Sequence, residues 1–304
     1  MQQHFKTILR DIQEDEIGIT LPHEHICCYS EYLYQMGGDK YLDKNKLVEC
    51  SIDYLKNLKE KYRLGTFIDC TPINIGRDVE LLKKISEQSG VNIICATGFY
   101  YTEELVLNNT SVDDLSQYIV LDAQKVNAGI IKCAVENENI SPFNEKLLRA
   151  CAKAHLELNL PIVMHSNAKN KNGIKELEII LSEGVKPQAV TVSHLSDTLD
   201  VEYIKSVAEN GCYIGLDRLY GNFTREYIDS KIKTIMDLFE CGYGDKILLS
   251  HDALFFNGFD AKPEIDSMPR FNYCFDHILP RFPEEITTKI MTDNVLSMLK
   301  CEEW

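Results

Sequence analysis

The chain has 304 residues, of which 44% are hydrophobic and 26% are charged, and its formal net charge is −15. This composition is ordinary for a globular protein, and a chain of this length can bury a large core without disulfide bonds. The negative charge disfavours nucleic acid and anionic membrane surfaces as partners, because both attract positively charged proteins.

Eight short apolar runs, rich in β-forming residues, recur along the chain. Runs that are apolar on both faces suit a parallel sheet that is covered by helices. In chain order the predicted strands are Ile17–Pro22, Thr66–Cys70, Asn92–Thr97, Ala128–Val135, Pro161–Met164, Ala189–Val192, Cys212–Leu216 and Lys246–Leu249.

The segments between these runs have the spacing of amphipathic helices, with apolar residues at i, i+3 and i+4. The clearest helices are predicted at Lys46–Lys61, Glu145–Leu158 and Gly173–Glu183. Eight alternations of strand and helix predict an α/β fold, a (β/α)8 TIM barrel, with a doubly wound open sheet as the alternative. Because no linker or low-complexity tract interrupts the pattern, we expect a single domain spanning residues 1–304.

The cysteines and the N-terminal residues bear on location. The chain has 11 cysteines, an odd number, and no CxxC pair, so we expect free thiols in a reducing compartment. Residues 1–16 lack the apolar core of a signal peptide, and no later run is long enough to span a bilayer. We therefore expect a cytoplasmic protein without a membrane segment.

Polar and charged residues lie at or near the ends of the predicted strands. In a TIM barrel these ends meet on one face, where active sites are built. Five of the eight histidines are among them, namely His23, His25, His165, His194 and His251. The strand-end residues in chain order are His23, Asp69, Tyr100, Lys132, His165, His194, Asp217 and Asp252.

The sharpest local motif is His23-Glu24-His25. Residues i and i+2 of a strand point the same way, so both imidazoles can reach one ion while Glu24 faces elsewhere. With Asp252 and the later histidines, the motif predicts a site for Zn, Mn, Fe, Co or Ni rather than Ca or Mg. Asp252 can also accept a proton from a bound water, although a lone aspartate there can instead cap a helix.

Lys132 is unusual because it lies in an apolar strand, where an unpaired ammonium is costly to bury. An ammonium also has no lone pair for a metal. The residue types leave two interpretations open: a structural lysine, snorkelling or paired with an acid, and a functional amine that is neutral or chemically converted.

Six motifs carry a resemblance to a known family: Thr20–His25, Ala128–Lys132, His165–Ala168, Ser193–Thr198, Gly215–Arg218 and Ser250–Asp252. In this order they resemble the phosphotriesterase family of the amidohydrolase superfamily. The stretch from His165 to Gly221 is most similar to the phosphotriesterase-like lactonases, for which Gly-Leu-Asp-Arg is typical.

The resemblance implies a two-metal site. His23, His25 and Asp252 would bind the more buried ion, and His165 and His194 the more exposed one. Lys132 would be carboxylated by CO2, and its carbamate would bridge both ions. Zinc is the first expectation for the metal, with Mn, Co and Fe as alternatives. Relatives are often dimers, so a homodimer is an open expectation.

The implied reaction is the opening of a lactone ring by a metal-bridging hydroxide. Asp252 would accept the proton, and Tyr100 and Arg218 would lie beside the reacting group. A sugar lactone, with or without a phosphate, and an acyl-homoserine lactone both fit. Lys169, Lys171, Arg218, Arg225 and Arg270 are cations that could face an anionic group, and the loop Ala253–Arg270 is expected to carry specificity.

Three other functions remain open. Phosphotriesterase or phosphodiesterase activity would use the same metals. Deamination or amide hydrolysis is known among superfamily relatives, but the lactonase-like segments favour it less. An inert barrel with a binding role is disfavoured because all six ligand positions are present.

Overall fold

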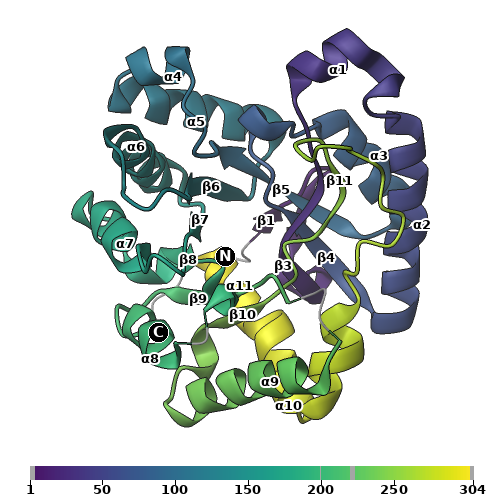
Figure 1. Cartoon of the computed structure of the whole chain (residues 1–304), viewed down its shortest axis with the longest axis vertical. Coiled ribbons are helices and arrows are strands. Elements are labelled where there is room, and N and C mark those ends of the chain that lie inside the picture. Colours follow the sequence, from purple (N-terminus) through teal and green to yellow (C-terminus); the bar gives the residue numbers. More distant parts are fainter. Residues whose placement is uncertain (1–3, 199, 220–222, 302–304) are drawn as a thin grey trace.

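The structure, a computed structural model, describes residues 4–198, 200–219 and 223–301. Parallel strands lie at its centre and helices surround them, which confirms the predicted TIM barrel (Figure 1). The barrel strands are β3 (Ile19–Cys28), β4 (Leu64–Asp69), β5 (Asn92–Gly98), β6 (Ile130–Val135), β7 (Ile162–Ser166), β8 (Val190–Val192), β9 (Tyr213–Leu216) and β10 (Ile247–Leu249).

The helices that follow the strands cover the outside of the barrel (Figure 1). They are α1 (Glu31–Gly37), α2 (Lys44–Tyr62), α3 (Val79–Ser89), α4 (Leu105–Asn109), α5 (Val112–Val126), α6 (Pro142–Leu158), α7 (Gly173–Ser182), α8 (Val201–Ala208), α9 (Arg225–Glu240), α10 (Glu284–Thr288) and α11 (Asn294–Lys300). A short hairpin, β1 (His4–Lys6) with β2 (Asp11–Gln13), precedes the barrel.

The predicted helices match α2, α6 and α7 to within a few residues. The largest difference is at α6, which begins at Pro142 rather than Glu145. The Ser141 hydroxyl accepts the Asn144 N–H, and Pro142 stands at the first helical position, where its missing N–H costs nothing. The cap and the proline together extend the helix by one turn.

The barrel closes between its first and last strands, β3 and β10. The sheet runs in the order β10-β9-β8-β7-β6-β5-β4-β3-β11. On the closing side, the His23 N–H donates to Ser250 Oγ at 3.0 Å, and the Asp252 N–H donates to the His23 carbonyl at 3.0 Å. The closure therefore runs through predicted site residues.

The segment Ala253–Arg270 is not only a loop, as the sequence predicted. It contains a further strand, β11 (Leu254–Asn257), which pairs in parallel with the second half of β3. This pairing explains why β3 extends to Cys28, well past the predicted run, so that His23 and His25 lie within the strand. Phe255 and Phe256 are accordingly buried in the core and do not line the barrel mouth.

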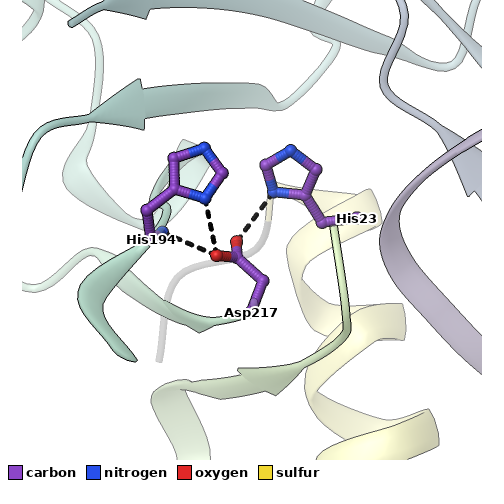
Figure 2. Close-up of side chains that lie close together, drawn as sticks. All are labelled: His23, His194 and Asp217. Atoms are coloured by element: carbon purple, nitrogen blue, oxygen red, sulfur yellow. Dashed lines mark hydrogen bonds and ion pairs between the residues drawn. The ribbon is translucent and has the colours of Figure 1, made fainter. Parts of the chain in front are cut away.

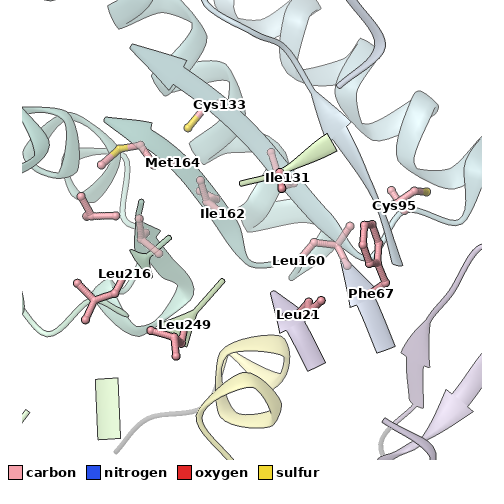
Figure 3. Close-up of a cluster of buried hydrophobic side chains, with 14 of the residues drawn as sticks. Leu21, Phe67, Cys95, Ile131, Cys133, Leu160, Ile162, Met164, Leu216 and Leu249 are labelled. Atoms are coloured by element: carbon pink, nitrogen blue, oxygen red, sulfur yellow. The ribbon is translucent and has the colours of Figure 1, made fainter. Parts of the chain in front are cut away.

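The alternation of side chains along the strands divides the core into two layers. Phe67, Ile131 and Ile162 belong to the large cluster that packs against the helices (Figure 3). Their chain neighbours Ile130 and Val163 belong to a separate cluster inside the barrel. Residues two positions further along each strand therefore also point inward, above this inner cluster.

All eleven cysteines are free and most are buried, as predicted. Within the described residues, no helix is long and apolar enough to cross a membrane.

Candidate metal centre

The inner layer of the core sets the position of two predicted site residues. Lys132 follows inward-facing Ile130 by two residues on β6, and His165 follows Val163 by two residues on β7. Both line a cavity of about 360 Å³ at the carboxyl ends of the strands. The other lining residues are His25, Cys28, Ile75, Tyr100, Arg218, Asp252, Leu254, Asn257 and Phe259.

His23 lies next to His25, which lines this cavity, as the His-x-His spacing predicts. Their ring centroids are 5.8 Å apart. Asp252 approaches both, with its Oδ1 3.1 Å from His25 Nε2 and 3.6 Å from His23 Nε2. The ligand atoms of these three residues lie close enough together to hold one metal ion.

Lys132 is buried, with 1% of its surface exposed. Its Nζ lies 2.6 Å from His23 Nε2. Among the described residues, no carboxylate lies within ion-pair distance of this amine, so it is neither a snorkelling lysine nor half of an ion pair. The backbone of β5 approaches the Lys132 backbone closely at Gly98, whose φ is +97°. A Cβ on Gly98 would lie only 2.1 Å from the Lys132 carbonyl oxygen. Glycine at position 98 thus allows the approach of β5 to the Lys132 backbone.

The second pair of histidines has an arrangement that neutral side chains do not explain. His165 Nε2 lies 2.7 Å from Glu136 Oε2, and His194 Nδ1 lies 2.7 Å from Asp217 Oδ1. A carboxylate only accepts hydrogen bonds, so each of these ring nitrogens carries the proton of its neutral imidazole. The remaining nitrogens, His165 Nδ1 and His194 Nε2, then face each other with lone pairs at 2.8 Å. A cation placed on both lone pairs would turn this repulsive contact into an attractive one.

Burial keeps these imidazoles neutral. It lowers the pKa of His23 to about 4, and the pKa values of His165 and His194 are also lowered, chiefly by burial. Neutral imidazole is the form that binds metals. These three histidines therefore have lone pairs available at neutral pH. Burial also opposes the charge of His25, but its contacts with Cys28 and Asp252 outweigh burial and raise its pKa to about 10.

Asp217 orients two of the histidines at once, and sequence reasoning assigned it no role. His23 Nδ1 lies 2.8 Å from Asp217 Oδ2, and Figure 2 shows both imidazoles directing Nδ1 at the same carboxylate. These three residues could themselves surround an ion. If Asp217 instead holds the two Nδ1 protons, both Nε2 atoms point away from it, toward Lys132 and His165, as expected of a carboxylate that fixes the tautomers of metal-binding histidines.

Arg218 connects Asp252 to a second carboxylate. Its Nε donates to Asp252 Oδ2 at 2.8 Å, and its Nη1 donates to Asp197 Oδ2 at 2.7 Å. Burial opposes the charge of Arg218, but Asp252 outweighs this effect and raises the arginine pKa above its usual range. The guanidinium therefore stays charged and holds one oxygen of Asp252.

Tyr100 lies at the cavity beside His165, with its ring edge-on to the imidazole and the centroids 5.5 Å apart. Asn74 fixes its backbone: Asn74 Oδ1 accepts the Tyr100 N–H at 2.7 Å, and Asn74 Nδ2 donates to the Tyr100 carbonyl at 3.2 Å. Nothing in the sequence indicates this contact, because the two residues follow different strands.

His251 does not face the cavity. Its Nε2 accepts the backbone N–H of Cys274 at 3.0 Å, so its single proton is on Nδ1, which donates to Glu24 at 2.6 Å. Both ring nitrogens are thus occupied, and this geometry supports a structural role for His251.

Of the five cations that the sequence singled out, Arg218 lines the cavity. The other four are not among the described lining residues. Lys171 pairs with Asp200 at 2.6 Å, and Arg225 pairs with Asp229 at 3.4 Å. The Arg270 guanidinium lies over the Phe223 ring.

Comparison with known proteins agrees with this geometry. The family model described as the phosphotriesterase family matches residues 3–303. The chain belongs to the phosphotriesterase family. The lactonase-like stretch that ends at Gly221 includes residues 199, 220 and 221, which are outside the described residues.

Three similar proteins illustrate the range of relatives. An aryldialkylphosphatase of Saccharolobus solfataricus is 33% identical over 79% of this chain and 78% of its own length. A phosphotriesterase homology protein of Mycobacterium tuberculosis is 29% identical over 88% of this chain and 86% of its own. The human N-acetyltaurine hydrolase is 25% identical over 98% of this chain and 95% of its own.

Membership of the phosphotriesterase family makes this chain a hydrolase of a family that depends on two metal ions and acts on small molecules. The donors gathered here, imidazoles and carboxylates, fit divalent transition metals.

Proposed function

We propose that this protein is a binuclear-metal hydrolase that opens lactone rings, and that residues 1–304 act as one hydrolase domain. The observation that carries the metal assignment is the 2.8 Å contact between His165 Nδ1 and His194 Nε2. The lactonase-like stretch from His165 to Gly221 supports a lactone as substrate.

The proposed ligands fall into two sets. His23, His25 and Asp252 hold one ion, and their ligand atoms lie within 4.8 Å of one another. His165 and His194 hold the second ion through the two facing lone pairs. Zinc is the metal best suited to these donors, and Mn, Co and Fe are the alternatives.

Lys132 is proposed to carry a CO2-derived carbamate that bridges the two sets. Its Nζ lies 2.6 Å from His23 Nε2, and the lysine lines the same cavity as His165 and Asp252. Carboxylation replaces a buried ammonium by an anion with two oxygen ligands. The lysine then needs no acidic partner, because the carbamate is itself an anion that bound cations would neutralise.

The chain's own groups supply proton transfer and positioning. When bound, the two ions would polarise the substrate carbonyl and supply a hydroxide nucleophile near neutral pH. Asp252 accepts the proton and passes it to the alkoxide that leaves as the ring opens. Arg218 holds Asp252 Oδ2, which leaves Oδ1 directed at the histidine pair. Tyr100, whose backbone is held by Asn74 and whose ring packs beside His165, would stabilise the developing oxyanion through its hydroxyl.

A substrate panel tests this proposal. The protein, loaded with Zn, Mn or Co in bicarbonate buffer, is assayed with sugar lactones with and without a 5-phosphate and with acyl-homoserine lactones. A dialkyl aryl phosphate and N-acetyltaurine are assayed beside them. We expect turnover of at least one lactone class, and its loss in Asp252→Asn. Turnover of phosphoesters or of the amide without any lactone would contradict the proposal.

Phosphotriesterase activity is the second candidate. It is favoured by the 33% identity to a relative named aryldialkylphosphatase. It would use the same metal positions, so the ratio of lactonase to phosphotriesterase kcat/KM distinguishes the two candidates.

A further inference from the structure

Glu24, the middle residue of the His-x-His motif, is fully buried at 0% exposure. Its neighbours on β3 point toward the proposed metals, whereas its own carboxylate contacts the segment 250–253 just after β10. Oε1 accepts from Ser250 Oγ at 2.8 Å, from the His251 N–H at 2.9 Å and from His251 Nδ1 at 2.6 Å. Oε2 accepts the Ala253 N–H at 3.0 Å.

These four hydrogen bonds bracket Asp252. His251 and Ala253, the residues on either side of it, are both held by the same carboxylate. Asp252 itself has a φ of +53°, in the left-handed region that a residue with a side chain rarely occupies. Such a conformation is strained and persists only where its surroundings enforce it.

We call Glu24 and its four hydrogen bonds to residues 250–253 the clamp. A further contact, between His251 and Cys274, holds the His251 imidazole in the clamp. His251 Nε2 accepts the N–H of Cys274, which fixes the proton on Nδ1 and keeps the imidazole directed at Glu24. Backbone hydrogen bonds between the strands do not hold every residue of this segment. The Asp252 N–H donates to the His23 carbonyl, but the His251 N–H donates to the Glu24 side chain.

We propose that Glu24 is a positioning residue: its buried carboxylate holds residues 250–253 in the conformation that delivers the Asp252 carboxylate to His25 and Arg218. The contacts at stake are Asp252 Oδ1 to His25 Nε2 at 3.1 Å and Arg218 Nε to Asp252 Oδ2 at 2.8 Å. Glu24 acts through Asp252 and touches neither substrate nor metal. The inference rests on the proposed metal assignment only where metal binding is the readout.

The test is Glu24→Gln, an exchange of similar shape that places an amide N–H against the Ala253 N–H. Glu176→Gln is the matched control, since Glu176 is also a glutamate at 0% exposure but lies on α7. Leu238→Ala, in the core face of α9, supplies a control for lost stability alone. Metal affinity is measured for each variant by competition with a chelator while zinc and then cobalt are titrated in.

In Glu24→Gln we expect the affinity of the buried ion to fall about 10-fold or more, the range typical of groups that orient metal ligands. The two controls should bind both ions as the wild type does. If Glu24 acts through Asp252, the double variant Glu24→Gln/Asp252→Asn should bind no more weakly than Asp252→Asn alone. Wild-type affinity in Glu24→Gln, or additive losses in the double variant, would overturn the proposal.

A second readout does not depend on metal. In the metal-free protein, hydrogen exchange of the His251 and Ala253 amides should be faster in Glu24→Gln than in Glu176→Gln. Unchanged exchange would refute the clamp even if wild-type metal content upheld the proposed function. Conversely, suppose that the wild type binds no metal but that amide exchange is faster in Glu24→Gln. That result would contradict the proposed function and would still support the clamp. If Glu24→Gln does not fold, Ser250→Ala, which removes one donor to Glu24, should show a smaller effect in the same direction, and no effect there would count against the proposal.

Discussion

His194 Nε2 and His165 Nδ1 lie 2.8 Å apart with their lone pairs facing each other, because Asp217 and Glu136 take the proton-bearing nitrogens of the two rings. Two acceptors at this distance repel, and a shared cation is the simplest group that makes their contact favourable. The relationship joins two strands, β7 and β8, whose histidines are 29 residues apart in the chain.

Replacing one member of this pair should empty the more exposed site. We expect His165→Ala to bind one ion fewer than the wild type after dialysis and to lose at least about 100-fold in kcat, because even partners of metal ligands contribute 10- to 100-fold. Metal content by mass spectrometry checks the first effect. His155→Ala is the control, since His155 is also buried but bonds only the Leu160 carbonyl; an equal metal loss there would contradict the assignment.

Glu136 should affect metal binding only through its contact with His165. Its carboxylate accepts the His165 Nε2 proton and also contacts the Asn167 amide. Glu136→Gln weakens the acceptor, so we expect about a 10-fold loss of affinity at the more exposed ion, with the buried ion unchanged. Titration with cobalt, followed by its visible absorption, distinguishes the two sites. The exposed Glu138→Gln on the same loop should behave as the wild type.

Arg218 pairs with both Asp252 and Asp197, and weakening these pairs should lower kcat more than it lowers metal content. Arg218→Lys keeps the charge but loses the planar fork that reaches both carboxylates. Loss of one hydrogen bond to a charged group predicts a drop of about 10- to 100-fold in kcat, with metal content near that of the wild type. Arg225→Lys, at an exposed pair, is the control. An unchanged kcat would show that Arg218 does not position Asp252.

The raised pKa of the Glu176 carboxyl should make the folding stability of the protein depend on pH. Burial raises the pKa of its carboxyl well above the ordinary value of 4.5, so the folded protein binds this proton more tightly than the unfolded chain does. Its contribution to stability is complete below the unfolded pKa and is lost as pH rises through the folded pKa. The neutral amide of Glu176→Gln avoids that loss.

The melting temperature of Glu176→Gln should therefore exceed that of the wild type at pH 8, by roughly 2 °C or more for about 1 kcal/mol, and the difference should shrink toward pH 4. Thermal unfolding at a series of pH values measures it. The exposed Glu178→Gln on the same helix should show no such trend. A gain that grows toward low pH would have the wrong sign.

The sequence predicted the barrel well because strand and helix patterns are local. All eight barrel strands overlap their predicted runs, and the six predicted ligand positions lie together at the carboxyl ends. The sequence did not predict the full length of β3. The strand that pairs with its second half, β11, lies in a segment with the composition of a loop.

The residues that orient the site were also beyond sequence reasoning. Asp217 is at a predicted strand end, but nothing in its surroundings indicates that it contacts both His23 and His194. Asn74 and Glu24 contact residues that follow other strands, and such contacts follow from the closed barrel rather than from any local pattern. The role of Lys132 depends on what is absent around its amine, which only the structure reveals.

The central claim is that two ions lie at this end of the barrel, and anomalous X-ray diffraction from crystals of the zinc-loaded protein tests it most directly. The account predicts two peaks, one shared by His23, His25 and Asp252 and the other within about 2.0–2.1 Å of His165 Nδ1 and His194 Nε2. Density for a carbamate on Lys132 should join them. A single peak between Asp217 and the Nδ1 atoms of His23 and His194, or no peak at all, would contradict it.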